Sequence, residues 1–268
     1  MRNRPSWKPV RADLTKPSAA RVYNYFLGGS ANFAVDREFA HRALEIFPGA
    51  REYARLNRLF LQRVVRFYLD QGVRQFLDIG SGIPTAGAVH EIAQRLEPES
   101  AVVYVDNEAV AIAHSQLVLQ HNENATIVQG DMRDPEQLLR VPELTEMLDV
   151  QRPIGVLMLA MLHFIPDRED PAALLDRYLE LLAPGSYLAL SHVTADQLPE
   201  LNAAGELYRD TSTPATLRTA EQITEMLGGF DLLDPGVVFT PLWRPESEED
   251  VGPDPERAAS YAAVCRRP

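Results

Sequence analysis

The chain has 268 residues, of which 46% are hydrophobic and 24% charged, so it carries enough apolar material for a folded α/β core. The longest near-continuous apolar run, Ile154–Ile165, is shorter than the roughly 20 residues that a membrane span needs. The charged, proline-containing N-terminus lacks the apolar stretch of a secretory signal, and a single cysteine, Cys265, excludes an internal disulfide. These features predict a cytoplasmic protein without a membrane-spanning segment.

The net charge of −12 is distributed unevenly along the chain. Residues 1–72 hold 13 basic and 6 acidic side chains, a sum of +7, whereas residues 73–268 hold 13 basic and 32 acidic side chains, a sum of −19. The overall acidity argues against nucleic acid as the default partner. The basic head either packs against the acidic body or attracts an anionic ligand, and the charges alone leave both interpretations open.

Residues 1–72 show no strand pattern and predict a helical cap. Glycine and proline pairs divide this region into three predicted helices, at 18–26, 36–46 and 50–71.

From residue 73 onward, short apolar runs alternate with helical spacing. Strands are predicted at 73–79, 101–106, 125–130, 153–162 and 185–193, and helices at 85–96, 108–121, 134–148 with an interruption at Pro142, 171–182 and 219–227. Two short segments, 230–233 and 260–264, predict an antiparallel edge, and 234–257 predicts a loop. The pattern indicates a doubly wound, mostly parallel seven-stranded sheet in a domain covering 73–268.

The loop after the first strand, FLDIGSGIPT (76–85), restricts the ligand. A phosphate-binding P-loop ends in Gly-Lys-Ser/Thr, and no lysine follows Lys16. A dinucleotide site needs a third glycine where Thr85 stands, and Asp78 would repel a pyrophosphate but could hold a cation. Both a nucleotide triphosphatase and an NAD-dependent oxidoreductase are therefore disfavoured.

Acidic residues also follow the next two strands. Asp106 ends the second strand, where a carboxylate can accept hydrogen bonds from both ribose hydroxyls, and Asp131 follows the third. A single aspartate after a strand is commonly only a turn or cap residue. The ordered set fits S-adenosylmethionine, which has a cationic amino-acid end, a ribose, an adenine and no pyrophosphate.

The sequence resembles a known superfamily at these motifs. FLDIGSGIPT, VVYVDNE (102–108) and QGDMRDP (129–135) are similar to the first three motifs of class I S-adenosylmethionine-dependent methyltransferases, which have a Rossmann-like fold. More narrowly, residues 18–38 and 156–167 resemble the actinobacterial methyltransferase family formerly filed as a domain of unknown function. The resemblance extends from about residue 13 to the C-terminus.

The resemblance implies a role for each matched residue. The methionine end of S-adenosylmethionine would lie at Asp78, Gly80, Gly82, Leu159 and Ala160, the ribose at Asp106 and Asn107, and the adenine at Asp131 and Met132.

Because the sulfonium already activates the methyl group, the protein has to align the reactants and remove one proton from a neutral acceptor. His163, at the end of the fourth strand, is the candidate general base, and His192 is a weaker rival. Either could instead be a structural histidine bonded to backbone. His90-Glu91 does not begin a zinc-binding His-Glu-x-x-His motif, because residue 94 is Gln, and His114 and His121 have no nearby cysteine or paired carboxylates, so no metal site is expected.

The segment around Gly28-Gly29 has two interpretations. In a packing interpretation, Tyr23 and Phe26 form the buried stripe of a helix that ends at the glycines. In a lid interpretation, which the long N-terminal region favours, the segment covers the cofactor with the side chains of Asn24, Tyr25 and Asn32. Arg21 could pair with the carboxylate at the methionine end of the cofactor, or equally with the acidic body.

The leading hypothesis is a methyltransferase acting on a hydroxyl, amine or carbon of a small molecule. A protein or RNA methyltransferase, and a regulatory protein that binds S-adenosylmethionine without transferring methyl, are the alternatives. The sequence indicates no oligomeric state.

Overall fold

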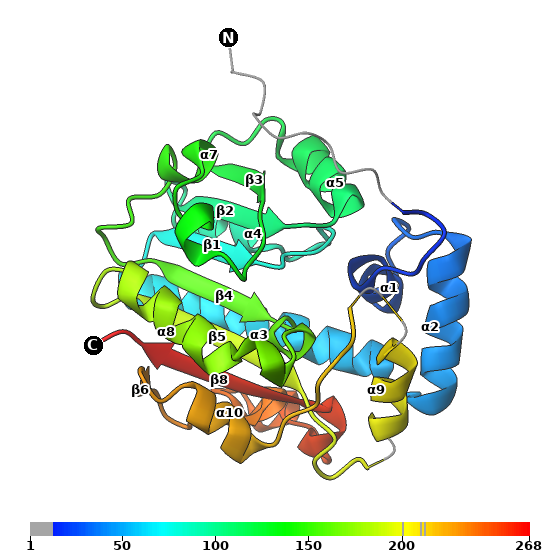
Figure 1. Ribbon diagram of the computed structural model, residues 1–268. Coiled ribbons are helices and arrows are strands. Elements are labelled where there is room, and N and C mark those ends of the chain that lie inside the picture. Colours follow the sequence, from blue (N-terminus) through cyan, green and yellow to red (C-terminus); the bar gives the residue numbers. More distant parts are fainter. Residues whose placement is uncertain (1–12, 200, 210, 212) are drawn as a thin grey trace.

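The computed structural model describes residues 13–268, apart from 200, 210 and 212. Its sheet consists of β1 (Gln75–Ile79), β2 (Ala101–Asp106), β3 (Ala125–Gln129), β4 (Gly155–Leu159), β5 (Tyr187–Val193), β6 (Asp231–Leu232), β7 (Val238–Phe239) and β8 (Ser260–Arg266). The strands lie in the order β3-β2-β1-β4-β5-β8-β6, and β7 pairs with β8 (Figure 1). Strands β1 to β5 pair in parallel, and β8 is antiparallel to its neighbours. The predicted mostly parallel sheet with an antiparallel edge is confirmed.

The described part of the sheet has one strand more than expected. The extra strand, β7, lies in the segment 234–257, for which the sequence predicts a loop. It is two residues long, too short to show an alternating pattern.

The helices are α1 (Ala19–Phe26), α2 (Ala34–Ile46), α3 (Ala50–Asp70), α4 (Val89–Leu96), α5 (Ala109–Leu119), α6 (Pro135–Leu138), α7 (Pro142–Thr145), α8 (Pro171–Leu181), α9 (Leu201–Arg209) and α10 (Ala220–Met226). Helix α4 begins four residues later than predicted, because the loop before it contains three glycines with positive φ, at 80, 82 and 87. The predicted interruption at Pro142 separates α6 from α7. Helix α9 was not predicted from the sequence.

Both faces of the sheet are covered, as buried parallel strands require (Figure 1). All five residues of β1 are buried. Leu77 and Ile79 belong to one core cluster, and Phe76 belongs to the cluster on the opposite face, which includes the C-terminal half of α3. Asp78 shares the face of Phe76, because successive side chains of a strand alternate.

We use the term cap for α1, α2 and the first two turns of α3. The cap has a core of its own, formed by Val22, Phe26, Phe39, Ala40, Ala43, Ala50 and Ala54. Two residues of α9, Leu207 and Tyr208, pack against this core, and the rings of Phe39 and Tyr208 are 4.9 Å apart. The cap and α9 therefore form one group beside the sheet, to which the remainder of α3 connects them (Figure 1).

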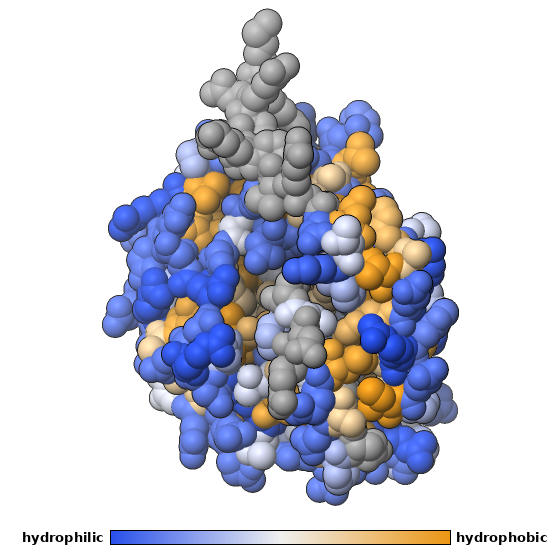
Figure 2. Space-filling model, turned by 45° about the vertical axis from the view of Figure 1, so that its right-hand side comes forward, coloured by the Kyte–Doolittle hydropathy of each residue, from blue (hydrophilic) through white to orange (hydrophobic). Residues whose placement is uncertain are grey.

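The face of the molecule in Figure 2 is mainly hydrophilic with separate apolar patches. No helix in the described parts of the chain is long and apolar enough to cross a membrane.

The cysteine of the chain, Cys265, lies in β8. It is fully buried opposite Leu188 of β5, and burial raises the pKa of its thiol.

Candidate functional site

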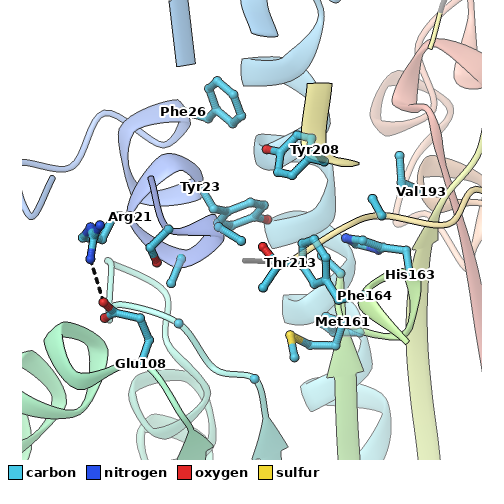
Figure 3. Close-up of a pocket in the computed structure, with 18 of the residues that line it drawn as sticks. Arg21, Tyr23, Phe26, Glu108, Met161, His163, Phe164, Val193, Tyr208 and Thr213 are labelled. Atoms are coloured by element: carbon cyan, nitrogen blue, oxygen red, sulfur yellow. Dashed lines mark hydrogen bonds and ion pairs between the residues drawn. The ribbon is translucent and has the colours of Figure 1, made fainter. Parts of the chain in front are cut away.

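A cavity of about 690 Å³ lies at the carboxyl ends of β1, β2 and β4, which is where parallel sheets bind ligands. The cap forms another wall, together with α9 and the chain that follows it to Leu217. Figure 3 shows side chains from these separate segments directed toward a common space. The cavity is within the roughly 300–1,000 Å³ typical of small-molecule sites.

The glycines after β1 shape one wall of the cavity. Gly80 has a φ of +71°, and an added Cβ would lie 2.1 Å from the sulfur of Met161. Gly82 has a φ of +65°, and its N–H donates to Oδ2 of Asp106 at 2.7 Å. An added Cβ at Gly82 would meet no atom within 4 Å, because this side of the loop faces open space. The turn thus needs glycine for its backbone conformation and, at Gly80, also for room.

Asp106 lies at the end of β2 and lines the cavity, as the sequence predicts. Its side chain is 8% exposed, and its Oδ1 accepts a hydrogen bond from the N–H of Glu108 at 2.8 Å. Burial raises the pKa of this carboxyl, while the backbone donors Glu108 and Gly82 oppose the rise. Each oxygen keeps a second lone pair, so both can still accept a hydroxyl donor from a ligand. Asn107 follows it along the wall.

Asp78 is the most perturbed acid of the cavity. It is 6% exposed, and burial, reinforced by the nearby Asp106, raises its pKa to about 7 against the opposing charge of Arg58. No hydrogen bond from a described residue offsets this cost. A cationic group placed beside Asp78 would favour its charged form.

Two buried polar atoms without partners lie in the same wall. Arg58, on α3, and Ser81 line the cavity, and neither Nε of Arg58 nor Oγ of Ser81 has a hydrogen-bond partner among the described residues. Within the described chain, the other nitrogens of Arg58 donate only to the hydroxyl of Thr85. Buried polar groups are normally paired, so these atoms, next to Asp78, indicate a place for a ligand with both an anionic and a cationic group.

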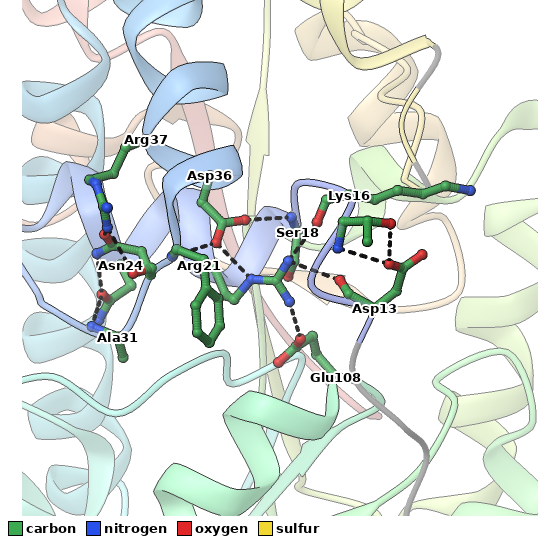
Figure 4. Close-up of polar contacts among 12 residues, drawn as sticks. Asp13, Lys16, Ser18, Arg21, Asn24, Ala31, Asp36, Arg37 and Glu108 are labelled. Carbon is green, nitrogen blue, oxygen red and sulfur yellow. Dashed lines mark hydrogen bonds and ion pairs between the residues drawn. The ribbon is translucent and has the colours of Figure 1, made fainter.

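Arg21, predicted either to reach the cofactor or to pair with the acidic body, does the latter. It lines the cavity but is 1% exposed, and its guanidinium pairs with Asp36 and Glu108, each at 2.8 Å (Figure 4). It also donates to the carbonyl of Lys16 at 2.6 Å. With these contacts Arg21 fastens the cap to the loop after β2, and Arg58 is the cation that keeps an unpaired donor.

Asn24, Tyr25 and Asn32 do not line the cavity, contrary to the lid interpretation of their side chains. Oδ1 of Asn24 accepts from the N–H of Ala31 at 3.0 Å and from Asn32 at 3.2 Å, so it holds the glycine turn together (Figure 4). The hydroxyl of Tyr25 bonds to His41 at 2.8 Å on the outer side of the cap. Tyr23 and Phe26, which the packing interpretation assigned to the buried stripe, do line the cavity.

Asp131 and Met132 also lie outside the cavity lining. Arg133, two residues further on, holds the carboxylate of Asp131 with several hydrogen bonds and lowers its pKa. Met132 is buried in the core, and its carbonyl accepts from Tyr178. From the end of β3, Gln129 is the side chain that lines the cavity.

At the end of β4, Leu159 and Ala160 line the cavity as predicted, and Ala160 has an unusual φ of +55°. Its N–H donates to Oγ of Ser191 at 2.9 Å, and Ser191 donates to Oδ1 of Asn57 at 2.6 Å. Asn57 in turn donates to the hydroxyl of Tyr23 at 3.0 Å. This buried chain of hydrogen bonds fixes the strand end relative to the cap.

His163 lines the cavity from a short 3₁₀ turn, Leu162–Phe164, just after β4. It is 5% exposed, its Nδ1 has no hydrogen-bond partner, and burial, with the nearby His192 and Arg218, holds its pKa well below the usual value. The imidazole is therefore neutral at pH 7.

His192 does not line the cavity. Its Nε2 accepts from Arg218 at 2.9 Å, so its Nδ1 carries the proton and donates to the carbonyl of Val193 at 2.8 Å. With both nitrogens engaged, His192 is a structural histidine and the rival role is not supported.

Several contributions to the cavity were missed from sequence, among them Asn57 and Arg58 on α3 and Tyr208 on α9. Asn57 had a usable signal, because it interrupts the apolar stripe of Ala54, Leu61 and Val64 at helical spacing. Helix α9 had none, since its sequence LNAAGELYR contains a glycine and few large apolar residues.

The comparison with known families agrees with this geometry. Residues 5–268 match the model of a family described as S-adenosyl methyltransferase. The chain belongs to this S-adenosyl methyltransferase family. S-adenosylmethionine is accordingly its cofactor, as the sequence predicted.

Two solved structures are similar to this methyltransferase over almost its whole length. A DUF574 family protein from Streptomyces avermitilis is 37% identical with a TM-score of 0.91, and the match covers 96% of this chain and 100% of that one. A candidate methyltransferase from Thermobifida fusca is 36% identical with a TM-score of 0.90, covering 98% and 99%.

A more distant structure shares only the fold. The N-methyltransferase NodS from Bradyrhizobium japonicum, solved with S-adenosylhomocysteine, is 14% identical with a TM-score of 0.50, covering 92% of this chain and 99% of NodS. No curated protein matches this chain.

Proposed function

We propose that this methyltransferase transfers the methyl group of S-adenosylmethionine to a small molecule bound between the sheet and the cap. The observation that carries the proposal is the group of Asp78, Arg58 and Ser81. A buried carboxylate, a guanidinium nitrogen and a hydroxyl, all without hydrogen-bond partners, match the ammonium and carboxylate of the methionine end. Asp106 and Asn107 then hold the ribose.

Arg58 replaces Arg21 in this proposal as the residue that binds the cofactor carboxylate. Arg21 is fully engaged by two carboxylates and a carbonyl, whereas Nε of Arg58 is buried without a partner. For the adenine, Gln129 is the side chain of β3 in the cavity, so it takes the place that the sequence motif suggested for Asp131.

Basic side chains of residues 1–72 make contacts within the molecule, which favours a small acceptor over a protein or RNA. Arg21 is buried in ion pairs, Arg63 donates to the carbonyls of Trp243 and Thr240, and Arg66 pairs with Glu246. These three described cations of residues 1–72 are thus engaged within the molecule and are not free to bind a polyanion.

The cofactor supplies a methyl carbon already activated by a sulfonium. The protein's share is to align the acceptor with it and to accept the proton of a neutral acceptor. His163 is the proposed proton acceptor, since it is a neutral imidazole in the cavity wall. Leu159 and Ala160 border the methionine end.

Calorimetry with S-adenosylhomocysteine tests the cofactor site. Arg58→Met should weaken binding about tenfold, because charge-assisted hydrogen bonds contribute about 1.5–3 kcal/mol. Arg55→Met is the matched control: it lies one turn earlier on α3, is exposed and pairs with Glu52. Equal affinities for the two variants would contradict the role of Arg58, and NAD affinity without S-adenosylhomocysteine affinity would contradict the function.

A second pair of variants tests the ribose site. Asp106→Ala should weaken S-adenosylhomocysteine binding at least about tenfold, whereas Asp131→Ala should change it less than twofold. Both residues follow strands, but Asp106 alone lines the cavity. A larger loss of affinity in Asp131→Ala than in Asp106→Ala would instead support binding of the cofactor by Asp131.

Methyl transfer itself is measured with radiolabelled S-adenosylmethionine and cell extract. We expect label in the small-molecule filtrate. Label confined to retained protein or RNA would support a macromolecular acceptor, and binding without any transfer would support the regulatory alternative.

A further inference from the structure

The part of the cavity opposite the glycine loop has a distinct lining. We call it the acceptor chamber and define it by Tyr23, Phe47, Tyr53, Phe164, Tyr208 and Leu217. These residues come from α1, from α3 and the turn before it, from the 3₁₀ turn after β4, and from α9 with the chain that follows it. In Figure 3, Tyr23, Phe164 and Tyr208 surround one space, with His163 at its border.

The aromatic rings of the chamber form contacting pairs. The rings of Tyr23 and Tyr53 are 6.3 Å apart at an edge-to-face angle of 89°, and those of Phe164 and Tyr208 are 6.4 Å apart. His163 continues this wall, because its ring lies 4.2 Å from that of Phe164. Walls of this kind offer both faces and edges of rings to a flat aromatic ligand.

Charge is segregated from the chamber. Among the described residues that line the cavity, the charged side chains come from the start of the cap, the ends of β1 and β2, and one position of α3: Asp13, Lys16, Arg21, Arg58, Asp78, Asp106 and Glu108. In Figure 3 the Arg21 and Glu108 pair lies on the opposite side of the cavity from His163 and Phe164. Arg58 is the charged residue of the lining that acts on the chamber, because its charge opposes the rise in the pKa of Tyr23. Away from Arg58, a charged acceptor would lose its water without gaining an ionic partner among the six residues that define the chamber.

The polar groups that do face the chamber are neutral. Burial raises the pKa of Tyr23 and Tyr53, so both remain phenols at pH 7. His163 lines the cavity as a neutral imidazole, and a neutral imidazole keeps one ring nitrogen as a hydrogen-bond acceptor. The chamber therefore offers an acceptor within an aromatic wall.

From this arrangement we infer that the methyl acceptor is an uncharged, flat aromatic molecule whose hydroxyl or amine donates a hydrogen bond to the neutral imidazole of His163. The inference rests on the proposed function and names the substrate class for it. The aromatic walls select the flat shape, the neutral side chains that define the chamber select neutrality, and His163 sets which atom faces the methyl group.

Three bicyclic probes of one size test the inference by calorimetry with S-adenosylhomocysteine present. We expect 2-naphthol to bind, and both its saturated analogue decahydro-2-naphthol and the anion 2-naphthoate to bind at least about tenfold more weakly. Equal binding of the saturated analogue would overturn the requirement for a flat aromatic ring. Tighter binding of the anion would overturn neutrality.

Variants locate the bound probe. Tyr208→Leu and Phe164→Leu should each weaken 2-naphthol binding about fivefold to tenfold, while S-adenosylhomocysteine affinity changes less than twofold. Tyr25→Leu is the control, because it removes a cap tyrosine that bonds to His41 outside the cavity. Unchanged 2-naphthol affinity in both chamber variants would overturn the assignment.

The affinity for S-adenosylhomocysteine distinguishes a wrong acceptor class from a wrong proposed function. Binding of S-adenosylhomocysteine without 2-naphthol binding would overturn the acceptor class and leave the proposed function standing. If the wild-type protein bound neither S-adenosylhomocysteine nor 2-naphthol, the proposed function itself would be overturned.

Discussion

The two ends of the cavity are built by different parts of the chain and by different chemistry. The cofactor end is made by the ends of β1 and β2 and the loops that follow them, and its key groups are two buried carboxylates, of which Asp106 is held by backbone donors. The acceptor chamber is made by helices distant in sequence, and its groups are neutral rings. The comparison teaches that a strand-end loop can specify a charged ligand locally, whereas a site for an apolar ligand depends on how separate helices pack.

Replacing His163 should give the largest kinetic effect and should leave the cofactor end intact. We expect His163→Asn to lower the rate by roughly 10²–10⁴-fold, the usual range for a lost general base, with S-adenosylhomocysteine affinity almost unchanged. Because the pKa of His163 lies well below its usual value, the base is unprotonated from pH 6 upward, and the wild-type rate should show no inflection near 6.5. Wild-type rates from the variant across pH 6 to 9 would remove His163 from the mechanism.

Arg21 fastens the cap to the loop after β2 at the cofactor end, so its loss should affect stability strongly. Arg21→Met leaves Asp36, which is fully buried, and Glu108 without their cation, and should lower the free energy of unfolding by about 3–5 kcal/mol. Arg55→Met breaks an exposed pair and should cost less than about 1 kcal/mol. Urea unfolding measures both, and similar losses would mean that Arg21 does not fasten the cap.

Asp78 should make the stability of the ligand-free protein depend on pH through the cofactor end of the cavity. Its folded pKa of about 7 lies above the ordinary 3.8, so its charged form destabilises the ligand-free fold as pH rises between these values. Asp78→Asn should therefore stabilise the ligand-free protein at pH 8 and have little effect at pH 4. Unfolding midpoints at the two pH values measure this difference.

The same shift predicts how the cofactor binds. Because the ammonium of the ligand needs the ionised carboxylate, wild-type affinity for S-adenosylhomocysteine should rise from pH 5 to 7 and then level off. The Asn variant should bind more weakly and without this rise. A parallel pH profile for the two proteins would show that Asp78 is not the group that titrates.

The sequence predicted the cofactor end better than the acceptor chamber for a physical reason. Gly80, Gly82 and Asp106 act through hydrogen bonds and dihedral angles within one strand and loop pair, so their spacing carries the information. The same local reasoning failed at Asp131, because Arg133 captures its carboxylate from two residues away.

The lining of the acceptor chamber could not be predicted in the same way, because it depends on contacts that the spacing of residues in the sequence does not encode. Tyr208 faces the cavity because α9 packs on α2, and Tyr23 does so because Asn57 of α3 holds its hydroxyl. Both contacts join segments far apart in the chain, so a pattern in one segment could not reveal them. Even in α1, the lid interpretation assigned Tyr25 to the cofactor, whereas Tyr23, two residues earlier on the opposite side of the helix, is the tyrosine that lines the cavity.

The burial of Cys265 has a consequence for chemical modification. The chain contains one thiol, and it is fully buried between β5 and β6 with its pKa raised, so alkylating reagents and mild oxidants have no reactive thiolate to attack. A cysteine introduced at Ser30, an exposed position in the glycine turn of the cap, would then be the single labelling site. A fluorophore attached there would report movement of the cap without a signal from the sheet.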